Sequence, residues 1–227
     1  MKNSFNKKNK LIKKLYDQGY LVLELPFEDK LSYASEMQSF FNDAFQQKNL
    51  DNKFQALVNR PELGSVPINT NTTIENLLKK TIKNSKIYEL AKKLWGCDEI
   101  LYSRNFSHFR YVDPAVLAQM QYQPIHIDYS FLNTKSLNIC IPATSYGGDY
   151  PGIEIFKEIK QKSFSYGEKK FENKEPEVVL GKALIFHEHT PHRRSVSRKK
   201  LIRINTEFRI FPDSTSDREA KLGLINL

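Results

Sequence analysis

The sequence predicts a single α+β domain in which a helical N-terminal half packs on an all-β C-terminal half. A chain of 227 residues is long enough to bury one core and has the usual length of one domain. Up to residue 98, apolar residues recur at helical spacing, as in Leu11, Ile12 and Leu15. From residue 99 on, short aromatic and β-branched runs are separated by Gly, Pro, Asn and Ser. Several short strands in succession favour a sandwich or a barrel.

The helical half is predicted from apolar spacing and from residues that end helices. Residues 8–17 form a helix that Gly19 ends, and the strand "YLVLEL" (20–25) follows and ends at Pro26. Residues 28–48 form a second helix, and the polar region 50–74 is a loop. Two more helices are expected at "TTIENLLKKTIKN" and at "SKIYELAKKLWG", where Gly96 ends the second.

The β half is predicted from alternating or continuous apolar runs bounded by turn residues. The strand candidates are "EILYSRNFSHFRYV", "AQMQYQPIHIDYSF", "SLNICIPAT", "GIEIFKEI", "EVVLGKALIF" with a turn at Gly181, and "LIRINTEFRIF".

Composition narrows the class of protein. The two cysteines, Cys97 and Cys140, are too few for a disulfide framework or a thiolate zinc site. No apolar run reaches the ~18 residues of a membrane span, and no signal-peptide core follows the basic N-terminus. We therefore expect a cytoplasmic protein without a membrane partner.

The formal net charge of +9 is concentrated in two basic blocks. The N-terminal block is expected to be a solvated helix face. The second block, which includes Arg193, Arg194, Arg198 and Lys199, is expected to favour an anionic substrate if it borders a pocket, and otherwise to be a solvated loop. Charge alone leaves nucleic acid open as a partner.

The segment "QPIHIDYSF" contains the first candidate metal ligands, His126 and Asp128. In a strand, residues two apart point to the same face, so both side chains can reach one ion or can both face water. A third ligand is expected in "HEHTPHRR", where His192 competes with His187 and His189. Arg203 follows His192 by eleven residues, at the start of the last long strand.

These residue types suit one kind of chemistry. Two histidines and one carboxylate on one face of Fe(II) leave the remaining coordination positions open for O₂ and a bidentate 2-oxo acid. The planar guanidinium of an arginine can hold the far carboxylate of 2-oxoglutarate through two parallel hydrogen bonds.

On these motifs the chain resembles the Fe(II)/2-oxoglutarate-dependent dioxygenases, in particular the phytanoyl-CoA dioxygenase-like group. The opening "LIKKLYDQGYLVLEL", the "HID" motif, "IPATSYGGDYPGIEIF" and "GKALIFHEHTPHRRSVSRKKLIRIN" are similar to segments of that group. The resemblance implies a double-stranded β-helix (jelly roll, cupin-like) over residues 99–212, flanking helices over 1–98 and a C-terminal tail over 213–227.

The resemblance also implies residue roles. By it, His126, Asp128 and His192 are the iron ligands and Arg203 binds the co-substrate 2-oxoglutarate. The implied reaction consumes O₂, releases succinate and CO₂, and hydroxylates a small molecule. Asp128 argues against halogenation, since halogenating relatives have a small residue there.

The sequence also offers two further candidate site residues and leaves two other functions possible. Tyr122 has the strand parity of His126, so its hydroxyl is a candidate co-substrate contact, and Asn138 is a polar residue in an apolar run that needs a partner. "RINTEFR" is similar to a pattern of nucleic-acid oxidative demethylases, and a non-catalytic jelly-roll binding protein is the third possibility. "GIEIFKEIK" departs from the group's usual segment, so the substrate is left open, as is the oligomeric state.

Overall fold

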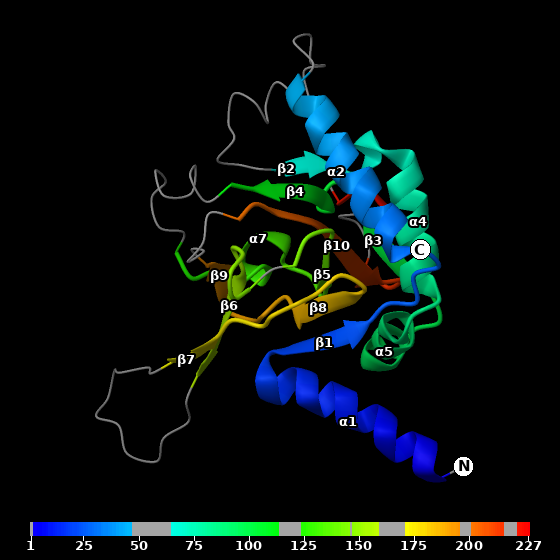
Figure 1. Ribbon diagram of the computed structural model, residues 1–227. Helices are drawn as coiled ribbons and strands as arrows, with labels where there is room; N and C mark the ends of the chain where they lie inside the picture. Colours follow the sequence, from blue (N-terminus) through cyan, green and yellow to red (C-terminus); the bar gives the residue numbers. More distant parts are fainter. Residues whose placement is uncertain are drawn as a thin grey trace.

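The computed structural model describes residues 2–46, 65–113, 124–145, 147–158, 171–195, 201–215 and 222–227. Two antiparallel sheets and a set of helices make up this part of the chain (Figure 1). No helix within these ranges is long and apolar enough to cross a membrane.

The four predicted helices are present. Their bounds are α1 Lys2–Gln18, α2 Lys30–Gln46, α4 Thr72–Lys83 and α5 Lys86–Trp95. Helices α1 and α5 end just before Gly19 and Gly96 as predicted, and α1 begins at Lys2, six residues earlier than predicted. Asn71 and Ser85 cap the first turns of α4 and α5 by accepting hydrogen bonds from the backbone N–H groups of Ile74 and Ile87. Gly96 ends α5 in the left-handed region with a φ of 65°, which a residue without Cβ adopts without strain.

The larger sheet contains eight strands, with the order β1-β8-β5-β10-β3-β11 and with β4 pairing both β10 and β2. Their bounds are β1 Tyr20–Glu24, β2 Ser65–Pro67, β3 Ile100–Ser103, β4 His108–Val112, β5 Leu137–Pro142, β8 Lys182–His187, β10 Arg203–Pro212 and β11 Leu224–Asn226. The long strand β10 pairs β5 along one edge, and β4 and then β3 along the other. It is therefore the central strand of this sheet.

Strand β10 is buried on both faces, and the two faces differ in chemistry. Ile204, Phe208 and Ile210 belong to the main apolar core that the sheet shares with α2, α4 and α5. Residues of the opposite parity, such as Arg203 and Glu207, line a cavity instead. One strand thus joins the apolar core to a charged interior.

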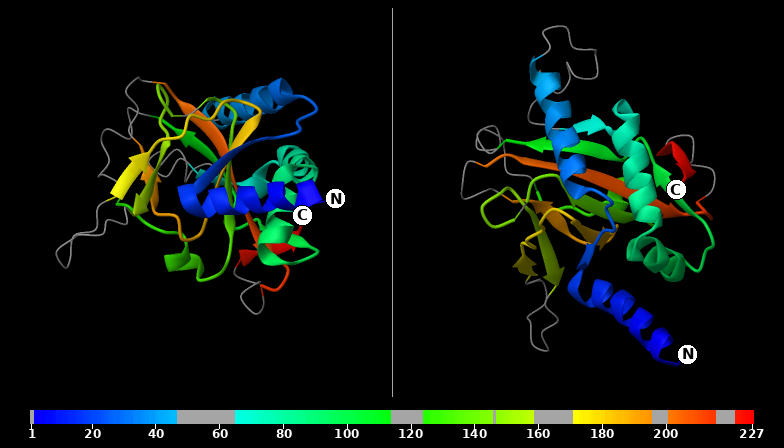
Figure 2. Two further views of the ribbon diagram at one scale, coloured as in Figure 1. Left: turned by 90° about the horizontal axis from the view of Figure 1, so that it is seen from below. Right: turned by 45° about the vertical axis from the view of Figure 1, so that its right-hand side comes forward.

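The smaller sheet contains β7, β6 and β9, in that order, with bounds Phe171–Lys174, Ile153–Glu158 and His192–Arg194. Figure 2 shows helices α2, α4 and α5 over one face of the larger sheet, while the smaller sheet lies away from them. Between the sheets, Ile153 and Ile155 of β6 pack with Leu184 and Phe186 of β8. The two sheets therefore enclose a second, smaller core.

The structure corrects several sequence predictions. The strand expected over "AQMQYQPIHIDYSF" is wrong over the part of it that the structure describes, from residue 124 on. His126 makes only an isolated bridge to His192, and Tyr129–Leu132 form the one-turn helix α7, which ends at Asn133 with a φ of 51°. In "EVVLGKALIF" the strand begins only at Lys182, after the predicted turn at Gly181. The expected loop ends in strand β2 and a 3₁₀ helix, Ile68–Thr70, and the C-terminal tail contains β11. Strand β7 was not predicted.

Tyr33 of α2 ties the helical layer to the larger sheet. Its hydroxyl group is fully buried, donates to the backbone carbonyl of Ile141 (3.1 Å) and lies 3.0 Å from the Thr206 hydroxyl. Burial raises the pKa of this phenol well above its usual value.

We expect Tyr33→Phe to lower the free energy of unfolding by about 1–2 kcal/mol, because the substitution leaves a buried carbonyl and hydroxyl without this partner. Urea denaturation measures the change. Tyr16→Phe is the matched control, since Tyr16 is 58% exposed, and it should stay within about 0.5 kcal/mol of wild type. Equal stability of the two variants would contradict the role given to the Tyr33 hydroxyl.

Candidate metal centre

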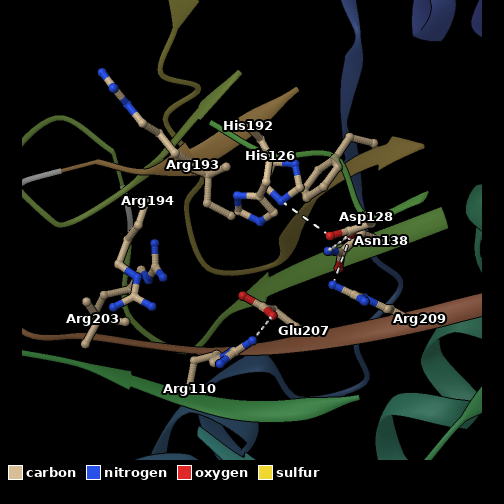
Figure 3. A pocket seen from close by; sticks show the side chains of 13 residues that line it. Arg110, His126, Asp128, Asn138, His192, Arg193, Arg194, Arg203, Glu207 and Arg209 are labelled. Carbon is tan, nitrogen blue, oxygen red and sulfur yellow. Dashed lines mark hydrogen bonds and ion pairs between the residues drawn. The ribbon is translucent and has the colours of Figure 1, made fainter. Parts of the chain in front are cut away.

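The structure brings together the side chains of His126, Asp128 and His192 beside strand β9 of the smaller sheet. One ligand atom from each lies within 4.8 Å of the others. His192 Nε2 is 3.8 Å from Asp128 Oδ1, and the two imidazole ring centroids are 4.4 Å apart. Figure 3 shows both imidazoles and the carboxylate pointing toward one another. Among the residues that the structure describes, this is the only such group of three.

Two features of the backbone bring these three residues together. His126 and His192 exchange backbone hydrogen bonds of 3.0 and 2.9 Å, so the two histidines lie directly opposite each other. Asp128 has helical backbone angles (φ −66°, ψ −30°) and begins α7, whose Tyr129 N–H donates to the Glu188 carbonyl. His126 and Asp128 were expected to share a face because residues two apart in a strand point the same way. That reason does not apply, because the chain turns at Asp128.

Backbone carbonyls orient both imidazoles. His192 Nδ1 lies 2.9 Å from the Thr190 carbonyl oxygen, and His126 Nδ1 lies 3.2 Å from that of Pro124. We infer that each Nδ1 carries the proton and donates it to the carbonyl, which leaves the Nε2 lone pair for a metal. Burial lowers the pKa of His192, although Asp128 acts in the opposite direction, so the neutral ring that a metal requires is favoured.

The two oxygens of the Asp128 carboxylate have different surroundings. Oδ2 accepts from Arg209 Nη2 at 3.0 Å and from Asn138 Nδ2 at 3.3 Å. Oδ1 is buried and has no hydrogen-bond partner. A buried carboxylate oxygen without a partner is costly. A cation bound beside the two Nε2 atoms would remove that cost, so these residues fit a divalent metal held by one carboxylate oxygen and two imidazoles.

Arg203, the predicted co-substrate residue, is buried and lines the same cavity as the three ligands. Its Nη1 donates to the carbonyls of Gly152 (2.8 Å) and Pro151 (3.2 Å) just before β6. Two backbone carbonyls thus hold the guanidinium in place.

The cavity has a volume of about 150 Å³ and a strongly basic lining. Its charged lining residues are Arg110, Arg193, Arg194, Arg203, Arg209, Asp128 and Glu207. Arg110 donates to Glu207 at 2.7 Å. Burial acts to raise the pKa of Glu207, but Arg110, Arg209 and Arg203 together hold it well below its usual value, so this carboxylate stays ionised.

The remaining sequence candidates are placed as follows. Asn138 has its partner in Asp128, so it supports a metal ligand. Tyr122, Arg198 and Lys199 lie outside the described residues. His187 and His189 do not join the metal group; their rings contact Tyr16 and Tyr129, at centroid distances of 5.4 and 4.3 Å.

His108, expected to be structural, lies in β4 opposite Glu207. Burial, with Arg110 nearby, lowers its pKa to about 4, so the ring is neutral at physiological pH. It is not part of the group of three metal-ligand candidates.

With this geometry in place, the chain can be compared with known proteins. No family model and no curated protein sequence matches it. Solved structures do match. The non-heme alpha ketoglutarate dependent epimerase SnoN from nogalamycin biosynthesis has a TM-score of 0.57 at 9% identity, covering 91% of this chain and 84% of its own.

Two further solved structures also match the fold of this chain. The carbocyclase SnoK from nogalamycin biosynthesis has a TM-score of 0.57 at 12% identity, covering 92% of this chain and 88% of its own. EctD from S. alaskensis with bound Fe has a TM-score of 0.58 at 13% identity, covering 86% and 73%. The chain shares their fold. At these identities the likeness is one of fold alone, and the chemistry has to be argued from the site.

Sequence reasoning missed the charged neighbours of the metal ligands. Arg209 appeared only as part of a secondary motif, whereas the structure places it against Asp128. Its parity with Arg203, six residues earlier in one strand, was the available signal. Glu207 has the same parity, but Arg110 gave no signal, because its contact with Glu207 depends on the pairing of β4 with β10.

We expect Arg209→Met to lower the free energy of unfolding of the metal-free protein by about 3–5 kcal/mol, since both partners of the Arg209–Asp128 pair are buried and the change leaves a buried charge. Saturating Ni(II) should stabilise this variant more than wild type, because the cation then meets the Asp128 charge without a competing guanidinium. Chemical denaturation with and without Ni(II) measures both effects.

The control is Lys80→Met, which breaks an exposed pair with Glu28 and should change stability by less than about 1 kcal/mol. If Arg209→Met matches this control and gains nothing from Ni(II), the pair does not position Asp128.

Proposed function

We propose that the protein is a non-haem, Fe(II)- and 2-oxoglutarate-dependent dioxygenase that hydroxylates a small molecule. The observation that carries the proposal is the buried Asp128 Oδ1 without a hydrogen-bond partner, beside two imidazoles whose Nδ1 atoms already have backbone partners. Two imidazole nitrogens and one carboxylate oxygen are the ligand set of non-haem Fe(II) oxygenases. Structures of EctD, which shares this fold, contain Fe and 2-oxoglutarate, and this supports the same choice.

The chain's own residues would perform four tasks in this reaction. His126, Asp128 and His192 would hold the metal, which supplies the activation of O₂ toward a C–H bond. Asn138 and Arg209 keep one Asp128 oxygen engaged, so a single oxygen is left to coordinate. Arg203 would bind the far carboxylate of 2-oxoglutarate. Phe186, which packs on His192 at 4.6 Å between ring centroids, would shield one side from water.

We infer a double-stranded β-helix for the two sheets. The support is their pairing: β4, β10, β5 and β8 lie side by side in one sheet, and residue 126, β9, β6 and β7 follow one another in the other. Membership of the phytanoyl-CoA dioxygenase-like group remains part of the proposal, supported by the "HID" motif and the spacing from His192 to Arg203.

We propose that the reaction is a hydroxylation and not another oxidation of the substrate. Asp128 argues against halogenation. The neighbours include an epimerase and a carbocyclase, so the fold hosts several outcomes. A non-catalytic binding protein would have no need for a buried carboxylate oxygen aimed at two imidazoles. No contact among the described residues specifically favours nucleic acid, so oxidative demethylation stays a secondary candidate.

Metal removal should abolish 2-oxoglutarate turnover, and Fe(II) should restore it. We expect the purified protein with Fe(II), 2-oxoglutarate, O₂ and ascorbate, which supplies the two electrons that a substrate would otherwise give, to form succinate, to lose this activity after chelation, and to lack it as Asp128→Ala, because one of three protein ligands is gone. Succinate is measured directly. His189→Ala, whose ring is exposed and outside the ligand group, should keep the activity. Succinate formation by Asp128→Ala at the wild-type rate would refute the ligand assignment.

Arg203→Ala should weaken 2-oxoglutarate binding by roughly 2–5 kcal/mol, since a desolvated carboxylate loses its charged partner. Arg203→Lys should recover only part, because an ammonium lacks the two parallel donors of a guanidinium. Calorimetric titration of 2-oxoglutarate into the Ni(II)-loaded protein measures the affinity. Unchanged affinity in Arg203→Ala would place the anchor elsewhere, with Arg209 or Arg194 next to test.

A further inference from the structure

Arg203, to which the proposed function assigns 2-oxoglutarate, is held by a short segment of chain just before β6. Its Nη1 donates to the carbonyls of Pro151 and Gly152, and all three residues are buried. A guanidinium binds a carboxylate through two parallel hydrogen bonds only when the planes of the two groups are aligned. The groups that fix these two carbonyls therefore determine how Arg203 meets the co-substrate.

Ser195, directly after β9, fixes both carbonyls. Its hydroxyl oxygen accepts from the Gly152 N–H at 2.6 Å, and its own backbone N–H donates to the Gly152 carbonyl oxygen at 3.1 Å. The Gly152 N–H belongs to the same planar peptide unit as the Pro151 carbonyl, so a partner that fixes the N–H also fixes that carbonyl. Ser195 is only 4% exposed, so bulk water does not compete for its hydroxyl group.

Glu175, directly after β7, is the next group in this series of contacts. The Ser195 hydroxyl donates its single proton to the Glu175 carboxylate. Hydrogen bonds in series polarise one another, so the carboxylate at the outer end strengthens the Pro151 carbonyl as an acceptor for Arg203 at the inner end. Glu175 is exposed and does not line the cavity. A negative charge near the surface thus supports a buried positive charge.

The residue type at position 152 agrees with this arrangement. Gly152 is not among the glycines with positive φ, so its backbone conformation is open to other residues. A Cβ at this position would lie 2.2 Å from Glu175 Oε1, the atom that the Ser195 hydroxyl contacts. Any side chain here would push the carboxylate away from the serine. Glycine at position 152 therefore preserves the contact between Glu175 and Ser195.

We propose that Ser195 and Glu175 are positioning residues for the co-substrate: through the Pro151–Gly152 peptide they fix the plane of the Arg203 guanidinium. This inference rests on the proposed function, because it takes Arg203 as the partner of 2-oxoglutarate. Neither positioning residue lines the cavity. A guanidinium whose acceptors shift turns with them and loses part of its alignment with the carboxylate, so the affinity for 2-oxoglutarate depends on residues outside the binding site.

Calorimetric titration of 2-oxoglutarate into the Ni(II)-loaded protein tests this role. Ser195→Ala should weaken binding about 10-fold, which corresponds to the loss of about one hydrogen bond. Ser195→Thr keeps the hydroxyl group and should recover most of the affinity. Glu175→Gln keeps an acceptor without its charge and should weaken binding by less, about 3-fold. The affinity for Ni(II) should be unchanged in all three variants, because the three metal ligands take no part in this series of contacts.

Ser85→Ala is the matched control. Ser85 is also 4% exposed, and its hydroxyl group also accepts from one backbone N–H and donates its proton once, but it caps α5. This variant should lose stability and bind 2-oxoglutarate as wild type does. Equal losses of affinity in Ser85→Ala and Ser195→Ala would show a general loss of stability and overturn the proposal. Wild-type affinity in Ser195→Ala would overturn it too.

The kinetic constants separate positioning from a general structural role. In the succinate assay, Ser195→Ala should raise the KM for 2-oxoglutarate about 10-fold and leave kcat within about twofold, because the far carboxylate is bound alike before and during the reaction. A fall in kcat at unchanged KM would contradict the positioning role.

Failure of this inference is distinguishable from failure of the proposed function. If wild type with Ni(II) binds no 2-oxoglutarate, the proposed function fails, and this inference fails with it. If wild type binds 2-oxoglutarate and the affinity falls in Arg203→Ala but not in Ser195→Ala, the proposed function stands and only this inference is wrong.

Discussion

Strand β10 has to satisfy two incompatible environments at once, and the rest of the structure follows from how it does so. Its Ile204, Phe208 and Ile210 side chains enter the main apolar core, whereas Arg203 and Arg209, on the other face, are buried without access to bulk water. Buried guanidiniums are stable only when they have acceptors or counter-charges. The larger sheet therefore needs a second layer over its charged face. The smaller sheet, the Gly152 carbonyl just before β6 and Asp128 at the start of α7 provide it.

The buried charges form two pairs that divide the cavity. Arg209 of β10 pairs with Asp128 at the candidate metal ligands, and Glu207 of the same strand pairs with Arg110 of β4. In each pair a guanidinium orients a carboxylate of the protein, and the pKa of Glu207 is held well below its usual value. This pairing explains how a cavity of about 150 Å³ accommodates Arg110 and Arg209.

The sequence predicted those features of the structure that interactions between residues close in the chain determine. The helices followed from apolar spacing and from the ends at Gly19 and Gly96. The convergence of His126, Asp128 and His192 was expected from the resemblance to Fe(II)/2-oxoglutarate-dependent dioxygenases, since residue type and spacing alone left the third histidine open. The turn at Asp128 into α7 escaped prediction, because a one-turn helix with a left-handed Asn133 leaves no periodicity to read. Contacts that depend on strand register, such as Arg209 opposite Asn138, also have no local signal.

Neighbours that share this fold catalyse an epimerisation and a carbocyclisation, so the metal and the fold cannot by themselves determine what is made. What distinguishes one such enzyme from another is where the substrate is held relative to the metal. In this chain β9 carries the candidate ligand His192, and Arg193, which bonds Glu154 of β6, and Arg194 follow it in the cavity lining. Because these side chains leave one strand, the spacing between the imidazole and the two guanidiniums is set by the strand itself.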